Sequence, residues 1–169
     1  MKTVVSCLLM ILMIMACTPS EKSATPKNTD FSNRTANLNT ADSLQSGQSY
    51  LSVYSQIYSF SENEQHDLTV TVSLRNVSET ESVFIGRADY FDTKGEVIKK
   101  YLDQTIVIKP METLEIVIEE NDKSGGTGAN FLFEWLAPKN CPEPLFEAVM
   151  ISTKGQQGLS FTTRSQRIL

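Results

Sequence analysis

The residues most suited to chemistry lie in a polar, glycine-rich stretch between residues 119 and 130. Its glycines free the backbone to turn amide groups inward, as anion-binding nests do. Phosphate loops of known mechanism, however, join a strand to a helix and place Lys and Ser or Thr at the helix start. Here Lys123 precedes the glycines and a strand pattern follows, so either a binding loop or a tight structural connection fits. The candidate ligand or partner residues are Asp122, Lys123, Ser124, Gly125, Gly126, Thr127, Gly128 and Asn130.

The same stretch supports one enzymatic hypothesis, an envelope hydrolase. Such an enzyme would use Asp122, Ser124 or Glu134 with backbone amides, and it requires the acidic cluster and the glycines to converge in one pocket. The single histidine, His66, excludes sites that need two imidazoles, among them the common His-based zinc sites. Because His66 follows a polar run and precedes Asp67 at a strand entrance, we expect an exposed side chain and no catalytic triad.

The other reactive side chains give weaker signals. Carboxylates at Glu119, Glu120 and Asp122 could hold calcium, but their spacing fits no known calcium loop and predicts a solvated rim. Cys141 lies in a proline-rich loop, and its use as a reactive thiol would require a cationic or histidine neighbour. We therefore assign no catalytic residue, no metal ligand and no cofactor from the sequence.

The first seventeen residues have the order of an export signal. Lys2 precedes an apolar stretch over residues 4–16, which is shorter than the about 20 residues of a membrane-spanning helix. The stretch ends in Ile14-Met-Ala-Cys17, which resembles a bacterial lipobox, and by that resemblance Cys17 becomes the lipid-bearing first residue of the mature protein. The alternative is an ordinary signal peptide with an incidental cysteine. We predict a signal peptide over residues 1–16 and a lipid anchor to a membrane of the bacterial cell envelope, on its periplasmic or surface face.

Composition then separates a linker from a domain. Residues 17–48 are rich in Ser, Thr and Asn and lack apolar periodicity, so they cannot bury enough surface to offset the entropy of ordering and predict a disordered tether. Residues 49–169 have the patterning of one folded domain. The whole chain carries 15 basic and 20 acidic residues, a net charge of −5, which argues against a basic face that binds nucleic acid.

Strand patterns fill the predicted domain. Leu68, Val70, Val72 and Leu74 alternate with polar residues, and a strict period of two is typical of a central strand with a core on one side. Gly86 predicts a bulge or a close approach, and residues 92–95 predict a hairpin turn with glycine at positive φ. The expected strands cover residues 50–60, 68–76, 83–91, 96–102, 105–108, 113–119, 131–135, 146–152 and 159–163.

No helical pattern of two or more turns follows the signal. Seven to nine short strands with turn signals between them favour an all-β fold, namely a single antiparallel β-sandwich of immunoglobulin-like type. A small barrel is the alternative, which periodicity does not separate from a sandwich.

Several segments of the domain together resemble a bacterial domain-of-unknown-function family of small exported proteins. The resemblance covers nearly all of residues 49–169, and its most specific part is SGGTGANF at residues 124–131. It implies one domain and a bacterial envelope location, and no activity, cofactor or catalytic residue. The other segments that carry it are YLSVYSQIY (50–58), LRN (74–76), DYFD (89–92) followed by Gly95, EAVM (147–150) and GLSF (158–161).

Three functional hypotheses remain. The first is a non-enzymatic binding or assembly module that displays loops to an unknown protein or small-ligand partner from a lipid anchor on Cys17. The second is the hydrolase described above, with a site at residues 119–130. The third is a structural spacer, which the absence of any concave site would favour.

Overall fold

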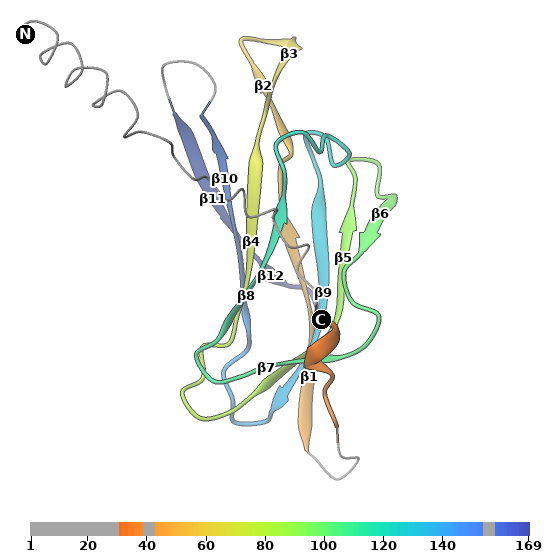
Figure 1. Ribbon diagram of the computed structural model, residues 1–169, viewed down its shortest axis with the longest axis vertical. Coiled ribbons are helices and arrows are strands. Elements are labelled where there is room, and N and C mark those ends of the chain that lie inside the picture. Colours follow the sequence, from red (N-terminus) through yellow and green to blue (C-terminus); the bar gives the residue numbers. More distant parts are fainter. Residues whose placement is uncertain (1–30, 39–42, 154–157) are drawn as a thin grey trace, which may run out of the picture.

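The computed structural model describes residues 31–38, 43–153 and 158–169, which fold into an antiparallel sandwich (Figure 1). The larger sheet has the order β12-β1-β9-β5-β6 with β7 also paired to β5, the smaller has the order β11-β10-β4-β8, and β2 and β3 form a separate hairpin. The strands are β1 (Leu44–Ser52), β2 (Gln56–Ser59), β3 (Ser61–Asp67), β4 (Thr69–Arg75), β5 (Val83–Phe91), β6 (Val97–Lys100), β7 (Ile106–Ile108), β8 (Thr113–Ile118), β9 (Asn130–Pro138), β10 (Leu145–Ser152), β11 (Leu159–Arg164) and β12 (Gln166–Arg167).

The period-two patterns identify the core correctly. Leu68, Val70, Val72 and Leu74 are fully buried, and β4 lies between β10 and β8 as the predicted central strand. On the facing sheet, alternate residues of β9 point inward and are buried. The predicted antiparallel β-sandwich is therefore confirmed, and two distinct sheets favour it over a barrel. An immunoglobulin-like connection pattern stays a prediction.

Stacked aromatic rings join the two sheets through the core. Phe133 of β9 lies parallel to Phe146 of β10, with ring centroids 4.1 Å apart, and Phe131 stacks between Phe133 and Tyr90. Aromatic pairs contribute about 0.5–1.5 kcal/mol beyond the area that they bury. This row of rings fixes the spacing between the sheets.

Two turn predictions are confirmed. The register between β5 and β9 shifts between Ile85 and Arg87, which leaves Gly86 as a bulge residue. Gly95 has a φ of +83° in the hairpin after β5, where the Asp92 side chain accepts hydrogen bonds from two backbone amides.

The domain begins earlier than residue 49. β1 starts at Leu44, and Phe31 is buried in the core beside the 3-10 helix η2 (Ser32–Arg34). Thr35 forms a β-bridge to Ile106. The predicted linker over residues 17–48 is therefore wrong for these parts, because a lone Phe and a Gly- and Ser-containing strand show no apolar periodicity.

The strand count is also higher than predicted, with twelve strands among the described residues. The single strand expected over residues 50–60 is divided between β1 and β2, which belong to different sheets. β3 was missed because its residues are polar and almost all exposed. The two-residue β12 is too short to show a period.

The N-terminal predictions lie outside the described residues. These are the signal peptide over residues 1–16, the lipid on Cys17 and the first part of the tether. In the described part of the chain, no helix has the length and apolar character of a transmembrane span.

Candidate functional site

The glycine-rich loop turns its backbone toward the protein. The Gly125 carbonyl accepts a hydrogen bond from Thr93 Oγ1, and the Gly128 amide donates to the same hydroxyl. The Gly126 carbonyl accepts from the Gln56 amide. The Gly128 amide, a donor of the kind that an anion-binding nest would present to a ligand, is thus used within the protein, and the two carbonyls join the loop to the hairpin after β5 and to the start of β2.

Two glycines are required by this packing. A Cβ built on Gly125 would lie 2.0 Å from Tyr90 Oη and 2.4 Å from Ser55 Oγ, two atoms that are hydrogen-bonded to each other. Gly126 has a φ of +68°, which disfavours residues with a side chain. The geometry thus gives this part of the loop a structural task.

The apex of the loop is exposed. Ser124 donates from its backbone amide and its hydroxyl to Asp122 Oδ1, and Lys123 Nζ forms an ion pair with Asp67 Oδ2 at 2.9 Å. Of the predicted binding residues, Asp122, Lys123 and Ser124 therefore present side chains to solvent, while Thr127 and Asn130 are half-buried.

Two tyrosines next to the loop have raised pKa values. Burial, with smaller effects from Tyr90 and Asp122, raises the pKa of Tyr101 to about 12. Burial also raises the pKa of Tyr90, against the opposing hydrogen bond to Ser55.

Tyr101 gives a testable dependence of stability on pH. Because its folded pKa is above the value of about 10 in an unfolded chain, the folded state holds the phenolic proton more tightly. The corresponding stability is present below pH 10 and is lost as the pH rises toward 12. An absorbance titration of tyrosinate, compared with Tyr101→Phe, should assign a late-ionising phenol to Tyr101. Ionisation of Tyr101 at the unfolded pKa would contradict this expectation.

The hydrolase arrangement is not assembled around Glu134. Glu134 lies on the outer face of β9, four residues beyond Asn130, and forms bonds with Gln48 and Arg87. Neither Asp122 nor Ser124 lines the groove around it. Its carboxylate is therefore bonded to residues of the neighbouring strands and not to the glycine-rich loop.

His66 is exposed, as predicted, and has one unpredicted contact. Its Nε2 lies 2.8 Å from Ser59 Oγ within the β2–β3 hairpin. The neighbouring Asp67 does not complete a triad, because successive strand residues face opposite sides and its carboxylate binds Gln56 and Lys123. The pair therefore has no orienting carboxylate from Asp67 and no shielding from water.

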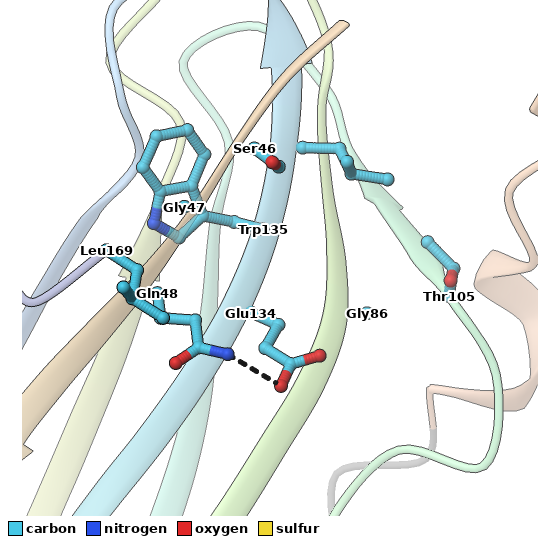
Figure 2. A pocket seen from close by; sticks show the side chains of 9 residues that line it. Ser46, Gly47, Gln48, Gly86, Thr105, Glu134, Trp135 and Leu169 are labelled. Carbon is cyan, nitrogen blue, oxygen red and sulfur yellow. Dashed lines mark hydrogen bonds between the residues drawn. The ribbon is translucent and has the colours of Figure 1, made fainter.

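A groove crosses the outer face of the larger sheet (Figure 2). Its volume is about 520 Å³, within the range of about 300–1,000 Å³ that is typical of ligand sites. The backbone of Gly47 on β1 and Gly86 on β5 forms the floor on either side of β9. The lining residues are Ser46, Gly47, Gln48, Gly86, Thr105, Glu134, Trp135, Leu136 and Leu169.

The strand register gives this groove two different walls. Ser46 pairs with Leu136, and Gln48 pairs with Glu134 two positions farther along. Side chains two residues apart point to the same face of a sheet, so both pairs project outward. The residue pair between them points to the opposite face, and this leaves the space of the groove. The wall formed by Ser46 and Leu136 is short and partly apolar, and the wall formed by Gln48 and Glu134 is polar.

The polar wall is a connected row of hydrogen bonds. Gln48 Nε2 and Arg87 Nη1 both donate to Glu134 Oε1, each at 3.2 Å, and Arg87 Nε donates to the buried Asp89 carboxylate at 2.7 Å. The hydrogen bond to Asp89 raises the pKa of Arg87, although burial opposes it and Glu134 reinforces it. Of these residues Gln48 and Glu134 line the groove, so the wall offers an amide and a carboxylate that Arg87 holds in place, which suits binding through hydrogen bonds.

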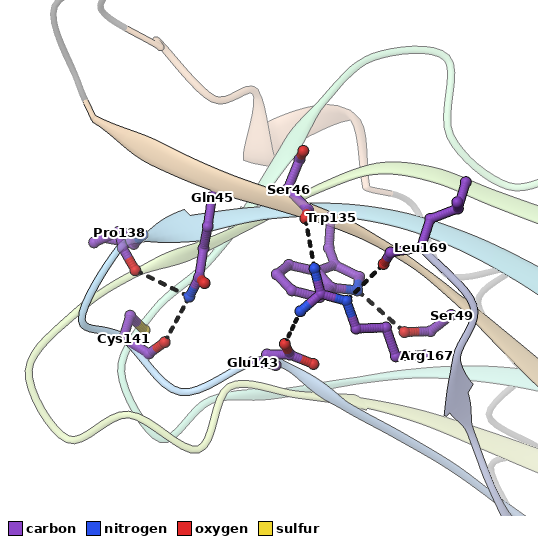
Figure 3. Close-up of polar contacts among 9 residues, drawn as sticks. All are labelled: Gln45, Ser46, Ser49, Trp135, Pro138, Cys141, Glu143, Arg167 and Leu169. Carbon is purple, nitrogen blue, oxygen red and sulfur yellow. Dashed lines mark hydrogen bonds and ion pairs between the residues drawn. The ribbon is translucent and has the colours of Figure 1, made fainter.

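The core side of the floor is built by Trp135 (Figure 3). Its indole covers Gly47, donates from Nε1 to Ser49 Oγ, and packs under the guanidinium of Arg167 at 5.2 Å from the ring centroid. Arg167 in turn donates to the Ser46 carbonyl and pairs with Glu143. These contacts hold the C-terminal residues against β1 and thereby fix one end of the groove.

Sequence reasoning missed this groove. Its residues come from β1, β5, β9, the residue before β7 and the C-terminus, and no local motif contains them. The bulge at Gly86 was the one local signal.

In the described part of the chain, no group of three or more His, Cys, Asp or Glu side chains could hold a metal ion.

Residues 46–168 match the model of a family described as a protein of unknown function, DUF3124. The chain belongs to this family. The DUF3124 match confirms the resemblance to an uncharacterised family and includes β1 to β12 except the first two residues of β1. Export and lipidation are not tested by it and stay predictions.

The structure of this DUF3124 domain is similar to the crystal structure of Thermotoga maritima 1070. The two share 10% sequence identity, with a TM-score of 0.45, over 71% of this chain and 92% of that chain. No curated protein matches the sequence.

Proposed function

We propose that this protein is a lipid-anchored component of the bacterial cell envelope whose β-sandwich binds a protein or small-ligand partner without catalysing a reaction. The lipobox-like residues ending at Cys17 support the anchor. The groove across β1, β9 and β5 is the observation that carries the binding function. A spacer would not need such a concave site.

The chemistry of the groove favours recognition over reaction. Its carboxylate, Glu134, is already paired with Arg87, and its amide, Gln48, bonds to the same oxygen. Paired groups of this kind orient a ligand through hydrogen bonds, whereas general-base catalysis needs a group that is free to accept a proton. The exposed apex of the glycine-rich loop, at Asp122–Ser124, is a secondary candidate surface for the same partner.

Filling the groove should abolish binding without unfolding the domain. A Cβ on Gly86 would meet Thr105 Oγ1 at 3.7 Å and the Glu134 carbonyl at 3.9 Å, which are ordinary contacts. We therefore expect Gly86→Leu to place its side chain in the trough and to change the free energy of unfolding by less than about 1 kcal/mol. A photo-reactive residue at Ser46, activated in intact envelopes, should give a crosslinked adduct that Gly86→Leu removes.

Ser160→Leu is the matched control, because it adds the same side chain to an exposed position of the other sheet. It should leave both stability and the adduct unchanged. Adducts that persist in a folded Gly86→Leu variant would exclude the groove as the binding site.

A further inference from the structure

The β2–β3 hairpin ends in an unusually exposed aromatic ring. Figure 1 shows this hairpin extending beyond the loops at its end of the sandwich. Phe60, at its tip, is 98% exposed, and Tyr58 is 57% exposed. Phe60 also has a φ of +56°, a conformation that is an outlier for a bulky residue.

Local contacts hold the tip in this form. The pairing of β2 with β3 shifts register between Tyr58 and Ser59, so that Ser59 pairs directly with Ser61 and Phe60 alone makes the turn. Ser59 Oγ bonds to His66, and Ser61 Oγ accepts from the Asn63 amide. Backbone strain of this kind is retained where the surroundings determine it, and it is concentrated at functional positions.

The base of the hairpin is fixed to the domain. The Gln56 amide donates to the Gly126 carbonyl, and the Leu68 amide donates to the Ser55 carbonyl. Lys123 of the glycine-rich loop pairs with Asp67 at the end of β3. The tip is therefore presented by an element that is bound to the sandwich at both strands.

The size of the apolar tip decides between two kinds of partner. An aromatic side chain presents about 150–250 Å², whereas a stable protein interface buries about 800 Å² on each partner. Apart from Tyr58 and Ile57, which packs against the core, the residues of β2 and β3 are small or polar. One convex ring between two serines is too small for such an interface, but it suits a lipid surface, which needs no complementary shape.

We propose that Phe60 inserts into the interface of the bilayer to which the chain is anchored, and so fixes the orientation of the domain on the membrane. This inference rests on the proposed lipid anchor at Cys17. The chain from Cys17 to Phe31 reaches at most about 50 Å when fully extended, so the anchor keeps the domain next to the bilayer. Insertion then acts as a second attachment at a high effective concentration. Glu62 and Glu64 follow the tip, so zwitterionic lipid is preferred to anionic lipid.

The test uses the full-length protein, purified from membranes and reconstituted into phosphatidylcholine vesicles with brominated acyl chains. The emission maximum of the tryptophan added in Phe60→Trp should shift to shorter wavelength, and the brominated chains should quench most of its emission. The native Trp135 is buried and gives the baseline. Added phosphatidylglycerol should reduce the quenching. A tryptophan at position 60 that stays unquenched on floated vesicles overturns the inference and assigns the ring to another partner.

Two variants make the result specific. Ser61→Asp in the Phe60→Trp background keeps an acceptor for the Asn63 amide but adds a charge beside the ring, so it should abolish quenching. Val149→Trp, on the outer face of the smaller sheet, should stay unquenched. Quenching that survives Ser61→Asp, or that is equal at position 149, also contradicts insertion.

Flotation of the vesicles tests the anchor separately. The parent protein should float and Cys17→Ser should not. Flotation without quenching overturns insertion alone, whereas a parent protein that fails to float overturns the anchor and, with it, the orientation proposed here.

Discussion

Replacing Gly125 with valine is expected to lower the free energy of unfolding by about 3 kcal/mol, because the new side chain has no space. Its Cβ alone would lie 2.0 Å from Tyr90 Oη, 2.4 Å from Ser55 Oγ and 2.8 Å from Ala129 Cβ. Accommodating it must separate the Tyr90–Ser55 pair, which is buried, and leaving such groups without a partner adds to the cost. Urea denaturation of the purified domain measures the loss.

Gly128→Ala is the control within the same loop. Its Cβ would approach Thr93 Cγ2 at 3.2 Å, which needs a shift of only a few tenths of an ångström. We expect it to cost less than about 1 kcal/mol, as substitutions outside the core usually do. Equal losses in the two variants would show that flexibility of the loop, and not the packing of Gly125, matters. A Gly125→Val variant of normal stability would show that Gly125 is not tightly packed and that the loop is free to bind a ligand.

Truncating Trp135 to alanine is expected to cost about 3–5 kcal/mol, the range for removing a buried aromatic residue. The indole is 1% exposed, covers Gly47 and lies under Arg167. Its loss leaves a cavity beneath the floor of the groove and removes the partner of Ser49 Oγ. Urea denaturation measures this effect as a lower midpoint of unfolding, with no change in the dependence of the free energy of unfolding on urea concentration.

A double-mutant cycle with Gly47 tests the geometry directly. Gly47→Ala alone would place a Cβ 2.3 Å from the indole, so we expect a loss of about 1–3 kcal/mol from overpacking. In the Trp135→Phe background the smaller ring frees this space, and the cost of Gly47→Ala should largely disappear. Additive losses would mean that Gly47 is required for a reason other than the indole.

Prediction from the sequence worked where burial follows a local period. The alternation from Leu68 to Leu74 correctly gave both the direction of the side chains and the central place of β4. It failed at β3, whose residues are polar and exposed, because a strand held by a hairpin turn and a few side-chain bonds needs no apolar face. It also failed at Phe31, since one buried residue has no period.

The glycine-rich loop shows in the same way what the sequence predicts and what only the fold decides about function. Its composition correctly identified a place where the backbone is free of Cβ atoms, and left open whether its amides face a ligand or the protein. Only the fold brings Thr93 and Gln56 to the loop, where they bond to the backbone of Gly125, Gly126 and Gly128. These partners lie more than thirty residues away in the chain.

By itself, the sequence determined the all-β class, the inward face of the strand from Leu68 to Leu74, an irregularity at Gly86 and the resemblance to the family, because these depend on patterns within a few residues or on short characteristic segments. The tertiary structure alone decided that Gln48 and Glu134 form one wall of a groove, with Arg87 bonded to Glu134, and that Phe60 is left at an exposed tip. The reason is physical: sheet pairing joins strands that are far apart in the chain, and no local period records which strands become neighbours.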